Sequence, residues 1–299
     1  MNAFDVIILT DNKHLKSTEN NLIIQNVLDE DNYVKLALER LGLKTLRLSW
    51  DDTSFDWSKT KFILFRSTWD YQNCYSEFSN WLNKVSKQTT MLNSENIIRW
   101  NVDKHYLLDL QNKGVNICES YFLETSESRN LQELATEFKL SEFILKPCVS
   151  GGGRHTYKIN KNNIAQHEEI FSELISNEAM IIQPFQYNIT EKGEISLVLI
   201  NGKFTHAVLK KAKRGDFRVQ DDFGGSVYNY TPTQAEIEFA KKAIKACSET
   251  PIYARVDIFT DNNGNLAIAE LELIEPELWF RNNPQAADKL AVEIQQLLQ

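Results

Sequence analysis

A lysine and a glycine-rich loop follow a short apolar segment near the middle of the chain. The apolar residues 143–145 precede Lys146, and Pro147 follows it. This order predicts a buried strand that carries one cation to its end, because proline cannot continue the hydrogen-bonded ladder. The loop that comes next contains Ser150, Gly151, Gly152 and Gly153.

The composition of this loop suits a polyphosphate. Glycine leaves the backbone N–H groups free to approach an anion, and the neighbouring lysine supplies a positive charge. The loop does not end in Gly-Lys-Ser or Gly-Lys-Thr, so it is not a P-loop. A mobile turn without a ligand is the alternative interpretation.

A second group of residues near the C-terminus is acidic. Asp257 shares one face of a predicted strand with Arg255. Glu270 and Glu272 share a face of the next predicted strand, because side chains alternate along a strand. Three carboxylates on one surface repel each other unless a cation lies between them, and Mg²⁺ prefers such oxygen ligands. The alternative is a hairpin whose carboxylates face solvent, although the apolar residues between them predict that its other face is buried.

Two further segments carry candidate binding residues. Five cations fall within residues 210–218, namely Lys210, Lys211, Lys213, Arg214 and Arg218. Nearby glycines would let this segment fold around an anion, whereas a solvated strand end is the alternative. The apolar strand predicted at residues 181–185 is followed by Glu191 and Glu194, and an ordinary edge strand is the alternative there.

Size and composition limit the classes of function. The 299 residues are enough for two or three domains. The hydrophobic share of 42% and the charged share of 25% are typical of a soluble globular protein. A net charge of −8 argues against a nucleic-acid binder that neutralises phosphates. No segment reaches the roughly 18 apolar residues of a membrane span.

The cysteines and the N-terminal segment favour a cytoplasmic location. Four cysteines lie far apart, with no Cys-x-x-Cys pair, so neither a zinc site nor a disulfide framework is expected. Asp5 precedes an apolar segment at residues 6–9 that is too short for a signal peptide.

Strands and helices are expected to alternate in the N-terminal part of the chain and to be mixed in the rest. Strands are expected at residues 4–10, 45–50, 62–66, 143–145, 181–185, 195–200, 203–209, 253–259 and 266–273. Helices are expected at residues 31–41, 104–113, 131–138, 168–175, 234–248 and 286–298. Asn201-Gly202 predicts a type I′ hairpin turn. This pattern indicates an α/β unit over about the first 90 residues and an α+β arrangement after it.

The order of these features resembles the ATP-grasp superfamily over about residues 93–280. The C-terminal half is similar to the prokaryotic glutathione synthetase type of ATP-grasp ligase. Residues 65–71, 100–104 and 270–276 are similar to the branch that contains the O-ureido-serine cyclo-ligase of cycloserine biosynthesis. The resemblance implies an ATP-grasp fold with three domains. An N-terminal α/β domain would span residues 1–92, a small lobe with the glycine-rich lid residues 93–186, and a large lobe with the metal and phosphate site residues 187–299.

The resemblance also implies which residues bind the nucleotide. Lys104 and Lys146 would hold the α- and β-phosphates, and the loop Ser150–Gly153 would cover the triphosphate. The backbone of Gln183, Pro184 and Phe185 would meet the adenine edge. Glu194, or alternatively Glu191, would contact the ribose hydroxyls.

Metal binding and phosphoryl transfer are assigned by the same resemblance. Asp257, Glu270 and Glu272 would hold two Mg²⁺ ions, with Mn²⁺ as an alternative. Lys210, Arg218 and Arg255 would contact the γ-phosphate and the acyl phosphate. One departure is that the family's third metal ligand is usually Asn, whereas this chain has Glu272. The added negative charge would either tighten metal binding or weaken phosphate binding.

The N-terminal unit carries a candidate substrate segment at the end of a predicted strand. It consists of Arg66, Ser67, Trp69, Asp70 and Tyr71. An arginine beside aromatic side chains would hold a substrate carboxylate with two hydrogen bonds. The alternative is a turn in which the aromatic rings pack and Asp70 pairs with Arg66.

The function implied is that of an ADP-forming carboxylate–amine ligase. Phosphoryl transfer from ATP would convert a small amino-acid-like carboxylate into an acyl phosphate, which an amine or similar nucleophile attacks. The nucleophile would belong to the same substrate molecule or to a second one. A small-molecule kinase and a non-catalytic nucleotide-binding regulatory module are the alternatives. No nucleic-acid or membrane partner is expected, and both a homodimer and a homotetramer stay open.

Overall fold

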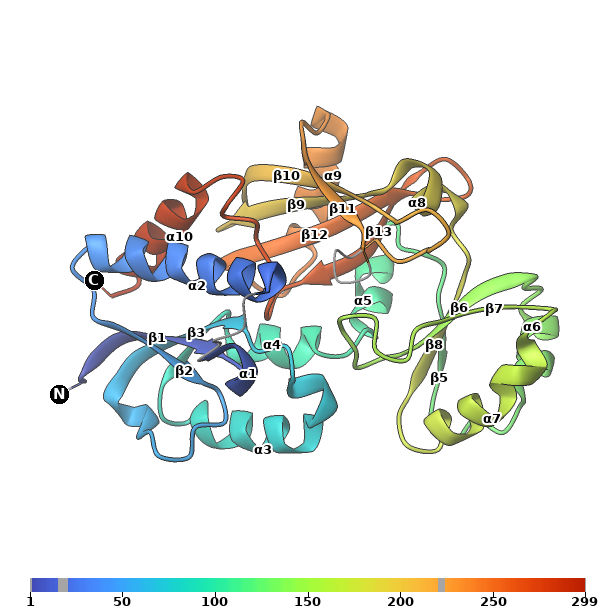
Figure 1. Cartoon of the computed structure of the whole chain (residues 1–299), viewed down its shortest axis with the longest axis horizontal. Coiled ribbons are helices and arrows are strands. Elements are labelled where there is room, and N and C mark those ends of the chain that lie inside the picture. The colour runs from blue at the N-terminus through green and yellow to red at the C-terminus, as the bar shows by residue number, and fades with distance from the viewer. Residues whose placement is uncertain (1, 16–20, 220–223, 299) are drawn as a thin grey trace.

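Three β-sheets with helices packed on them build the molecule (Figure 1). The computed structural model describes residues 2–15, 21–219 and 224–298. The N-terminal sheet is parallel, and the two sheets that follow along the chain are antiparallel. None of the helices in these ranges is long and apolar enough to span a membrane.

The N-terminal unit alternates strands and helices. Its elements are β1 (Phe4–Thr10), α1 (Asn12–Leu15), α2 (Leu22–Arg40), β2 (Thr45–Ser49), β3 (Thr60–Ser67), α3 (Tyr75–Val85) and β4 (Thr90–Leu92), with 3₁₀ turns at Trp57–Lys59 and Tyr71–Asn73. The strand order is β2-β1-β3-β4. Val6 and Ile8 of β1 face one hydrophobic core, whereas Ile7 and Leu9 face another. This explains the continuous apolar run in β1, because both faces of the sheet are covered.

The small sheet follows two short helices. Its surroundings comprise α4 (Glu95–Asn101), α5 (Tyr106–Asn112), β5 (Tyr121–Leu123), α6 (Leu131–Glu137), β6 (Glu142–Pro147), β7 (Tyr157–Asn160), α7 (Ile164–Ile175) and β8 (Met180–Pro184). The strand order is β5-β8-β6-β7. Leu134 of α6 and Phe171 of α7 pack against Leu145 of β6 in one core. A capping box between Asn130 and Glu133 begins α6.

The large sheet forms the C-terminal part of the molecule. Its elements are α8 (Tyr187–Lys192), β9 (Glu194–Ile200), β10 (Lys203–Lys211), β11 (Ser226–Tyr230), α9 (Gln234–Lys245), β12 (Tyr253–Thr260), β13 (Leu266–Glu272) and α10 (Gln285–Gln296). The strand order is β11-β10-β9-β12-β13. The turn between β9 and β10 has φ of +47° at Asn201 and +70° at Gly202. These positive angles confirm the predicted type I′ turn.

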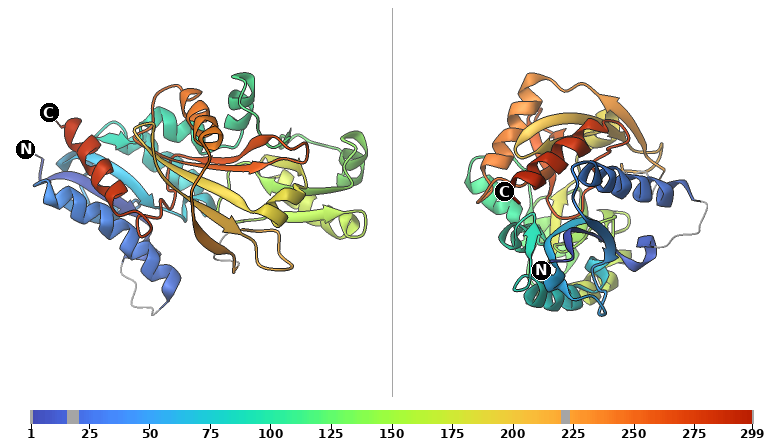
Figure 2. Two further views of the ribbon diagram at one scale, coloured as in Figure 1. Left: turned by 90° about the horizontal axis from the view of Figure 1, so that it is seen from above. Right: turned by 90° about the vertical axis from the view of Figure 1, so that its left-hand side faces the viewer.

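Helices from opposite ends of the chain join the N-terminal unit to the large sheet. α2 and α10 lie side by side in both figures (Figures 1 and 2). The core between them includes Val6 and Leu64 of the N-terminal sheet and Val208 of the large sheet. The two units therefore share one hydrophobic core. The predicted domain boundaries at residues 92/93 and 186/187 stay a prediction.

The predicted elements agree with the structure to within a few residues at most ends, and most of the missed elements are short. The helix predicted at residues 31–41 is the second half of α2, which begins at Leu22. The helices and strands that were not predicted are α1, α3, α4, β4, β5, β7, α8 and β11. The strands among them have only three to five residues, and their sequences show no clear apolar run or alternation.

A buried ion pair within the N-terminal unit forms hydrogen bonds to the segment after β13. Arg66, near the end of β3, is 2% exposed, and its Nη2 lies 3.3 Å from Oε1 of Glu30 on α2. The same nitrogen donates to the carbonyl of Pro276 at 2.8 Å. The Glu30 carboxylate accepts from the backbone N–H groups of Leu278 and Phe280 at 2.6 and 2.9 Å. The pair therefore fixes the path of this segment against α2 and β3.

We expect Glu30→Ala to lower the free energy of unfolding by about 3–5 kcal/mol, because it leaves the Arg66 guanidinium buried without its carboxylate. Urea unfolding of the purified variant measures the loss. Glu39→Ala on the same helix is the control, since its pair with Lys35 is exposed and is worth at most about 1 kcal/mol. Equal losses for the two variants would contradict a special role for the buried pair.

Candidate active site

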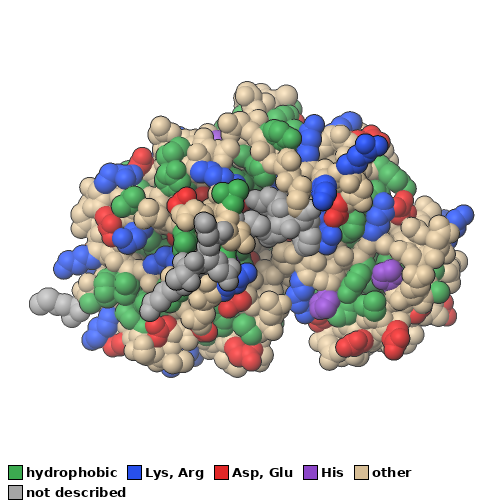
Figure 3. Space-filling view, viewed as in Figure 1, with side chains coloured by type: hydrophobic (Ala, Val, Ile, Leu, Met, Phe, Trp, Pro, Cys, Tyr) green, Lys and Arg blue, Asp and Glu red, His purple; other side chains and the backbone are tan. Residues whose placement is uncertain are grey.

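Two adjoining pockets lie where the small sheet, the large sheet and the N-terminal unit meet. The glycine-loop pocket is bounded by Lys146, the glycine loop at residues 150–153 and residues 183–185. From the side shown in Figure 3, a notch at the lower edge separates the part that carries the small sheet from the N-terminal unit.

The second pocket, called the glutamate pocket here, lies towards the N-terminal unit. Its lining includes Trp69, Tyr71, Gln72, Glu272, Glu275 and Glu277. The two pockets share a wall made of Lys104, Ser150, Gly151, Gly152, Lys210, Arg255 and Glu270. A group held at this wall is in contact with both pockets.

Strands β12 and β13 bring the predicted acidic residues together. In their register Arg255 pairs with Glu272, and Asp257 pairs with Glu270. Asp257 is 1% exposed, and the side chains of Glu270 and Glu272 are 31% and 26% exposed. The residues between them on both strands are buried in the core against α5 and α9. The hairpin therefore has one apolar and one charged face, and the alternative of carboxylates directed into bulk solvent is wrong.

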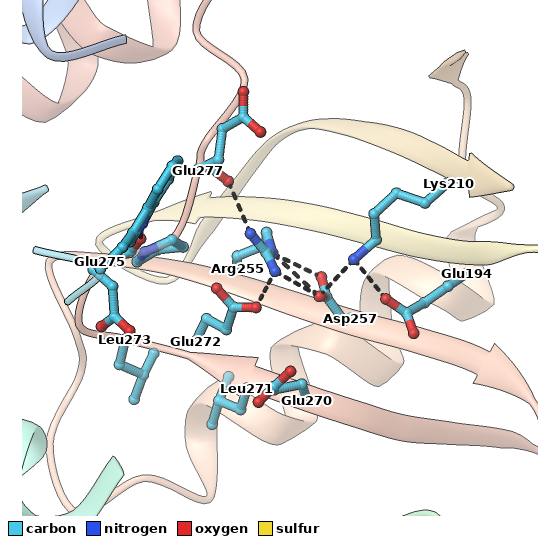
Figure 4. A network of polar contacts seen from close by, with 12 residues as sticks. Glu194, Lys210, Arg255, Asp257, Glu270, Leu271, Glu272, Leu273, Glu275 and Glu277 are labelled. Atoms are coloured by element: carbon cyan, nitrogen blue, oxygen red, sulfur yellow. Dashed lines mark hydrogen bonds and ion pairs between the residues drawn. The ribbon is translucent and has the colours of Figure 1, made fainter. Parts of the chain in front are cut away.

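Arg255 lies between Asp257 and Glu272 (Figure 4). Its Nε is 3.0 Å from Oδ1 of Asp257, and its Nη2 is 2.9 Å from Oδ2. The Nη2 atom is also in contact with the Glu272 carboxylate. Lys210 approaches Asp257 from the other side, with its Nζ 2.9 Å from Oδ2 and 2.5 Å from Oε1 of Glu194. These groups form a continuous chain of alternating charge across the sheet.

The carboxylates in this chain have different proton affinities. Burial acts to raise the pKa of Asp257, but Arg255 and Lys210 outweigh it and hold the pKa below its usual range. Burial raises the pKa of Glu272 to about 8, with Arg255 opposing the rise and the neighbouring carboxylates adding to it. A further cation at the site would therefore stabilise the ionised form of Glu272.

Lys104 and Lys146 both line the glycine-loop pocket, but their surroundings differ. Lys104 has its Nζ 3.0 Å from Oε1 of Glu270 and donates to the Ser150 carbonyl. Lys146 forms no ion pair with any residue in the described ranges, and burial lowers its pKa. Lys146 is therefore a cation that an anionic ligand could pair with in this pocket.

The glycine loop is closely packed against the N-terminal unit. A side chain at position 151 would place its Cβ 2.2 Å from Nε2 of Gln72, so only glycine fits there without a shift of Gln72. Gly152 and Gly153 have φ of +57° and +72°, which glycine adopts without strain. The Ser150 hydroxyl donates to the carbonyl of Arg154 at 3.0 Å and so closes the loop on itself.

Apolar side chains also line the glycine-loop pocket. They include Ile144, Phe185, Phe217, Val219 and Phe259. Gln183 and Pro184 also line it, and Nε2 of Gln183 donates to Oγ of Ser120 at 2.8 Å. An apolar slot beside backbone polar groups suits a flat heterocyclic base.

The structure separates the two alternatives that the sequence left for a ribose contact. Glu194 lines the glycine-loop pocket and pairs with Lys210. Glu191 is exposed on α8 and is not among the described residues that line either pocket. Its position therefore does not support a contact with a ligand, because the helix directs it to solvent.

Arg218 lines the glycine-loop pocket. Its Nη2 is 2.9 Å from Oδ2 of Asp216, and the backbone N–H of Arg218 donates to the same carboxylate. The basic residues at 210–218 therefore lie in two different places. Lys210 is buried in the large sheet, whereas Arg218 is on the loop that follows β10.

Only part of the candidate substrate segment lines a pocket. Trp69 and Tyr71 line the glutamate pocket. Arg66 does not, because its guanidinium is buried against Glu30, so its assignment to substrate binding is wrong. The alternative pairing of Asp70 with Arg66 is wrong too, since Arg66 bonds to Glu30.

Two more residues of this segment have structural partners instead of a place in the pocket. The Ser67 hydroxyl donates to Asp31 at 2.6 Å. The Asp70 carboxylate accepts from Nε1 of Trp50 at 2.7 Å. Neither is among the described residues that line the glutamate pocket, which corrects their prediction as substrate contacts.

Several pocket residues had no assigned role in the sequence analysis. They include Gln72, Tyr106, Arg154, Glu275 and Glu277. Glu275 ends a Glu-x-Glu-x-x-Glu segment that begins in β13 and continues past its end, so its spacing from Glu272 was a signal. Gln72 gave no signal, because a glutamine in a turn is common and its partner is about two hundred positions away.

The oxygen donors of the charged face fit a hard divalent cation. Asp257, Glu270 and Glu272 offer carboxylates on adjacent strands of one face, as Mg²⁺ prefers. In the described ranges these carboxylates do not converge on one point, because Arg255 and Lys104 pair with them. Their assignment as metal ligands stays a prediction.

The sequence of the chain matches two protein-family models and one curated protein. The family model described as "D-cycloserine synthetase DcsG, N-terminal domain" matches residues 6–93. The family model described as "Prokaryotic glutathione synthetase, ATP-grasp domain" matches residues 116–268, which is more than half of the chain. The chain is 24% identical over 260 residues to the cycloserine biosynthesis protein DcsG of Streptomyces lavendulae, covering 81% of this chain and 85% of that protein.

Solved structures with the same fold include known ligases. The crystal structure of D-cycloserine synthetase DcsG matches with a TM-score of 0.85 and 22% identity, covering 98% of this chain and 99% of that chain. The D-alanine–D-alanine ligase of Bacillus anthracis complexed with ATP matches with a TM-score of 0.64 and 14% identity, covering 98% and 96%. The ATP-grasp ligase PsnB complexed with a minimal precursor matches with a TM-score of 0.65 and 13% identity, covering 99% of both chains.

The comparisons confirm the ATP-grasp fold that the sequence predicted, with an N-terminal domain in front of it, and they confirm the predicted similarity to the cycloserine branch. The prediction of an ADP-forming ligase is confirmed as well. On the match over residues 116–268, the chain belongs to the prokaryotic glutathione synthetase family of ATP-grasp ligases.

Proposed function

We propose that the chain joins a small amino-acid-like carboxylate to a nitrogen nucleophile through an acyl phosphate. The observation that carries this proposal is the wall shared by the two pockets. Lys104, Lys210 and Arg255 are common to both, so a phosphoryl group held there contacts a nucleotide on one side and a carboxylate on the other. A nucleotide-binding module that does not catalyse a reaction needs only the first pocket.

The nucleotide would occupy the glycine-loop pocket. The apolar side chains near Phe185 suit the adenine, Glu194 would meet the ribose, and Lys146 would supply an unpaired charge for the phosphates. The glycine loop would close over the triphosphate and exclude water, which protects a labile acyl phosphate.

The charged face would carry the phosphoryl transfer. Arg255 and Lys210 are held in place by Asp257, so their positive charges are oriented before a ligand arrives. Oriented charges stabilise the phosphoryl group in the transition state without reorganisation. A divalent cation bound by Asp257, Glu270 and Glu272 would neutralise phosphate charge, and two such ions are proposed.

The substrate carboxylate would enter the glutamate pocket. Residues of the N-terminal unit form one side of this pocket, and that unit matches the family model of the D-cycloserine synthetase N-terminal domain. This match supports a substrate that carries the carboxylate and the nucleophile in one molecule, so that ligation closes a ring. Ligation between two molecules is the alternative that the experiment below distinguishes.

We expect ADP release only when a suitable carboxylate is present. A coupled ADP assay is run with amino acids of both configurations, dipeptides and O-substituted serines, each with and without hydroxylamine. A ligase gives carboxylate-dependent ADP, and hydroxylamine traps its acyl phosphate as a hydroxamate. A stable phosphorylated product would instead indicate a kinase, and nucleotide binding without any ADP would indicate a regulatory module. Mass spectrometry of the product distinguishes ring closure from joining two molecules.

We expect Lys146→Ala to lower turnover at least about a hundredfold, because a well-placed donor to a developing charge is worth about 3 kcal/mol. Lys146→Arg should retain more activity, since it keeps the positive charge. Lys161→Ala is the control, because this lysine is exposed in the turn after β7. Turnover of Lys146→Ala within threefold of wild type would remove this lysine from the site.

We expect Glu272→Asn to raise the Mg²⁺ concentration needed for half-maximal activity roughly tenfold, because affinity for such ions follows the number of charged ligands. The titration is performed at saturating ATP with the substrate found in the assay above. Glu137→Gln, which removes an exposed carboxylate on α6, is the control. An unchanged Mg²⁺ requirement would show that Glu272 is not a metal ligand.

A further inference from the structure

One glutamate of the glutamate pocket differs from its neighbours in its partners. Among the residues that the structure describes, four glutamates line the pocket, namely Glu270, Glu272, Glu275 and Glu277. Three of them pair with cations: Glu270 with Lys104, Glu272 with Arg255, and Glu277 with Arg281. Glu275 has no ion pair with any residue in the described ranges. Its carboxylate is therefore available to a ligand.

Side chains of the N-terminal unit hold Glu275 in position. Nε2 of Gln72 donates to its Oε1 at 3.2 Å, and the Tyr71 hydroxyl forms a hydrogen bond with the same carboxylate. Tyr71 is 4% exposed, and burial raises its pKa well above the usual value, so the hydroxyl stays protonated and can donate. Nε1 of Trp69 donates to the backbone carbonyl of Glu275 at 2.9 Å. The carboxylate is thus oriented by neutral donors.

Glu275 lies close to the wall at which the pockets meet. Its partner Gln72 abuts Gly151, which belongs to both pockets. Lys104 and Glu270, also members of the shared wall, act electrostatically on Glu275. A substrate whose carboxylate is phosphorylated at the wall would therefore have its neighbouring atoms beside Glu275.

Ligation requires that a proton leave the attacking nitrogen. The neutral nitrogen forms a C–N bond to the acyl carbon, and the C–O bond to the phosphate breaks. The nitrogen then carries one proton too many, whereas the departing phosphate lacks one. A carboxylate that takes the proton from nitrogen and returns it to phosphate leaves an amide and hydrogen phosphate, with the enzyme unchanged.

We propose that Glu275, oriented by Tyr71 and Gln72, contacts the attacking nitrogen and takes its proton during ligation. This inference rests on the proposed function and assigns the residue that serves its second step. Paired carboxylates are less suited to this role, because taking up a proton would cost them the ion pair with the neighbouring cation. In agreement with the geometry, burial raises the pKa of Glu275 to about 7, which suits a group that accepts and returns a proton near neutrality.

The experiment compares two nucleophiles on one acyl phosphate. Hydroxylamine attacks acyl phosphates without assistance, whereas the natural nitrogen requires a base. The probes are O-ureidoserine, which carries its own nitrogen, and D-alanine, which supplies both carboxylate and amine. For Glu275→Gln we expect ligation to fall by about a hundredfold or more, as for the loss of a general base, and hydroxamate formation to stay within about threefold of wild type. Glu275→Asp should recover part of the ligation, and Glu137→Gln should behave as wild type.

The outcomes distinguish this inference from the function on which it rests. If wild type releases no ADP with any carboxylate tested, the proposed function is wrong and this inference fails with it. If wild type ligates and Glu275→Gln ligates equally well, only the role of Glu275 is overturned. Equal losses of ligation and hydroxamate formation would mean that Glu275 merely supports the pocket, which also overturns the proposal. The thermal unfolding midpoint of each variant identifies losses caused by misfolding.

Discussion

The contact of Arg255 with Asp257 and Glu272 is the interaction on which the site depends. Burying several carboxylates on one sheet face is costly unless cations lie among them. Arg255 and Lys210 supply those cations from β12 and β10. The same contacts orient the cations towards the wall shared by the pockets. The cations that neutralise the buried carboxylates in the folded protein are therefore the same ones that an anionic ligand would meet.

A second constraint comes from the way the N-terminal unit is attached. The Arg66–Glu30 pair and the core between α2 and α10 fix this unit against the large sheet. Trp69, Tyr71 and Gln72 follow directly after β3, so their positions in the glutamate pocket depend on this attachment. An arginine that the sequence suggested for substrate binding thus acts indirectly, by fixing the turn whose other residues line the pocket.

The sequence predicted much of the fold because its longer elements carry clear periodic patterns. Strand β1 was predicted at its observed bounds, and the acidic hairpin was predicted with the correct charged and apolar faces. Lys104, Lys146 and the glycine loop were predicted together on the order of motifs, and they line one pocket. The chemical roles of these residues stay predictions.

What the sequence could not predict depends on contacts between distant segments. Arg66 looked like a ligand-binding residue because its strand end is where such residues often lie. Its partner Glu30 is 36 positions away on a helix whose first half was not predicted. The Gln72–Glu275 contact spans 203 positions and has no local pattern that could reveal it. Glu191 is exposed on α8, whereas Glu194 lines the pocket because it is the first residue of β9. The sequence did not predict α8, so it could not separate the two.

The packing of Gly151 against Gln72 has a consequence for how the family can vary. An alanine or larger residue at position 151 would displace the Gln72 amide and so release one hydrogen bond to Glu275. The two positions are therefore constrained as a pair, although one belongs to the lid and the other to the N-terminal unit. Among related chains, a residue larger than glycine at position 151 should accompany a residue shorter than glutamine at position 72. Such paired changes should mark enzymes in which the glutamate pocket has a different shape.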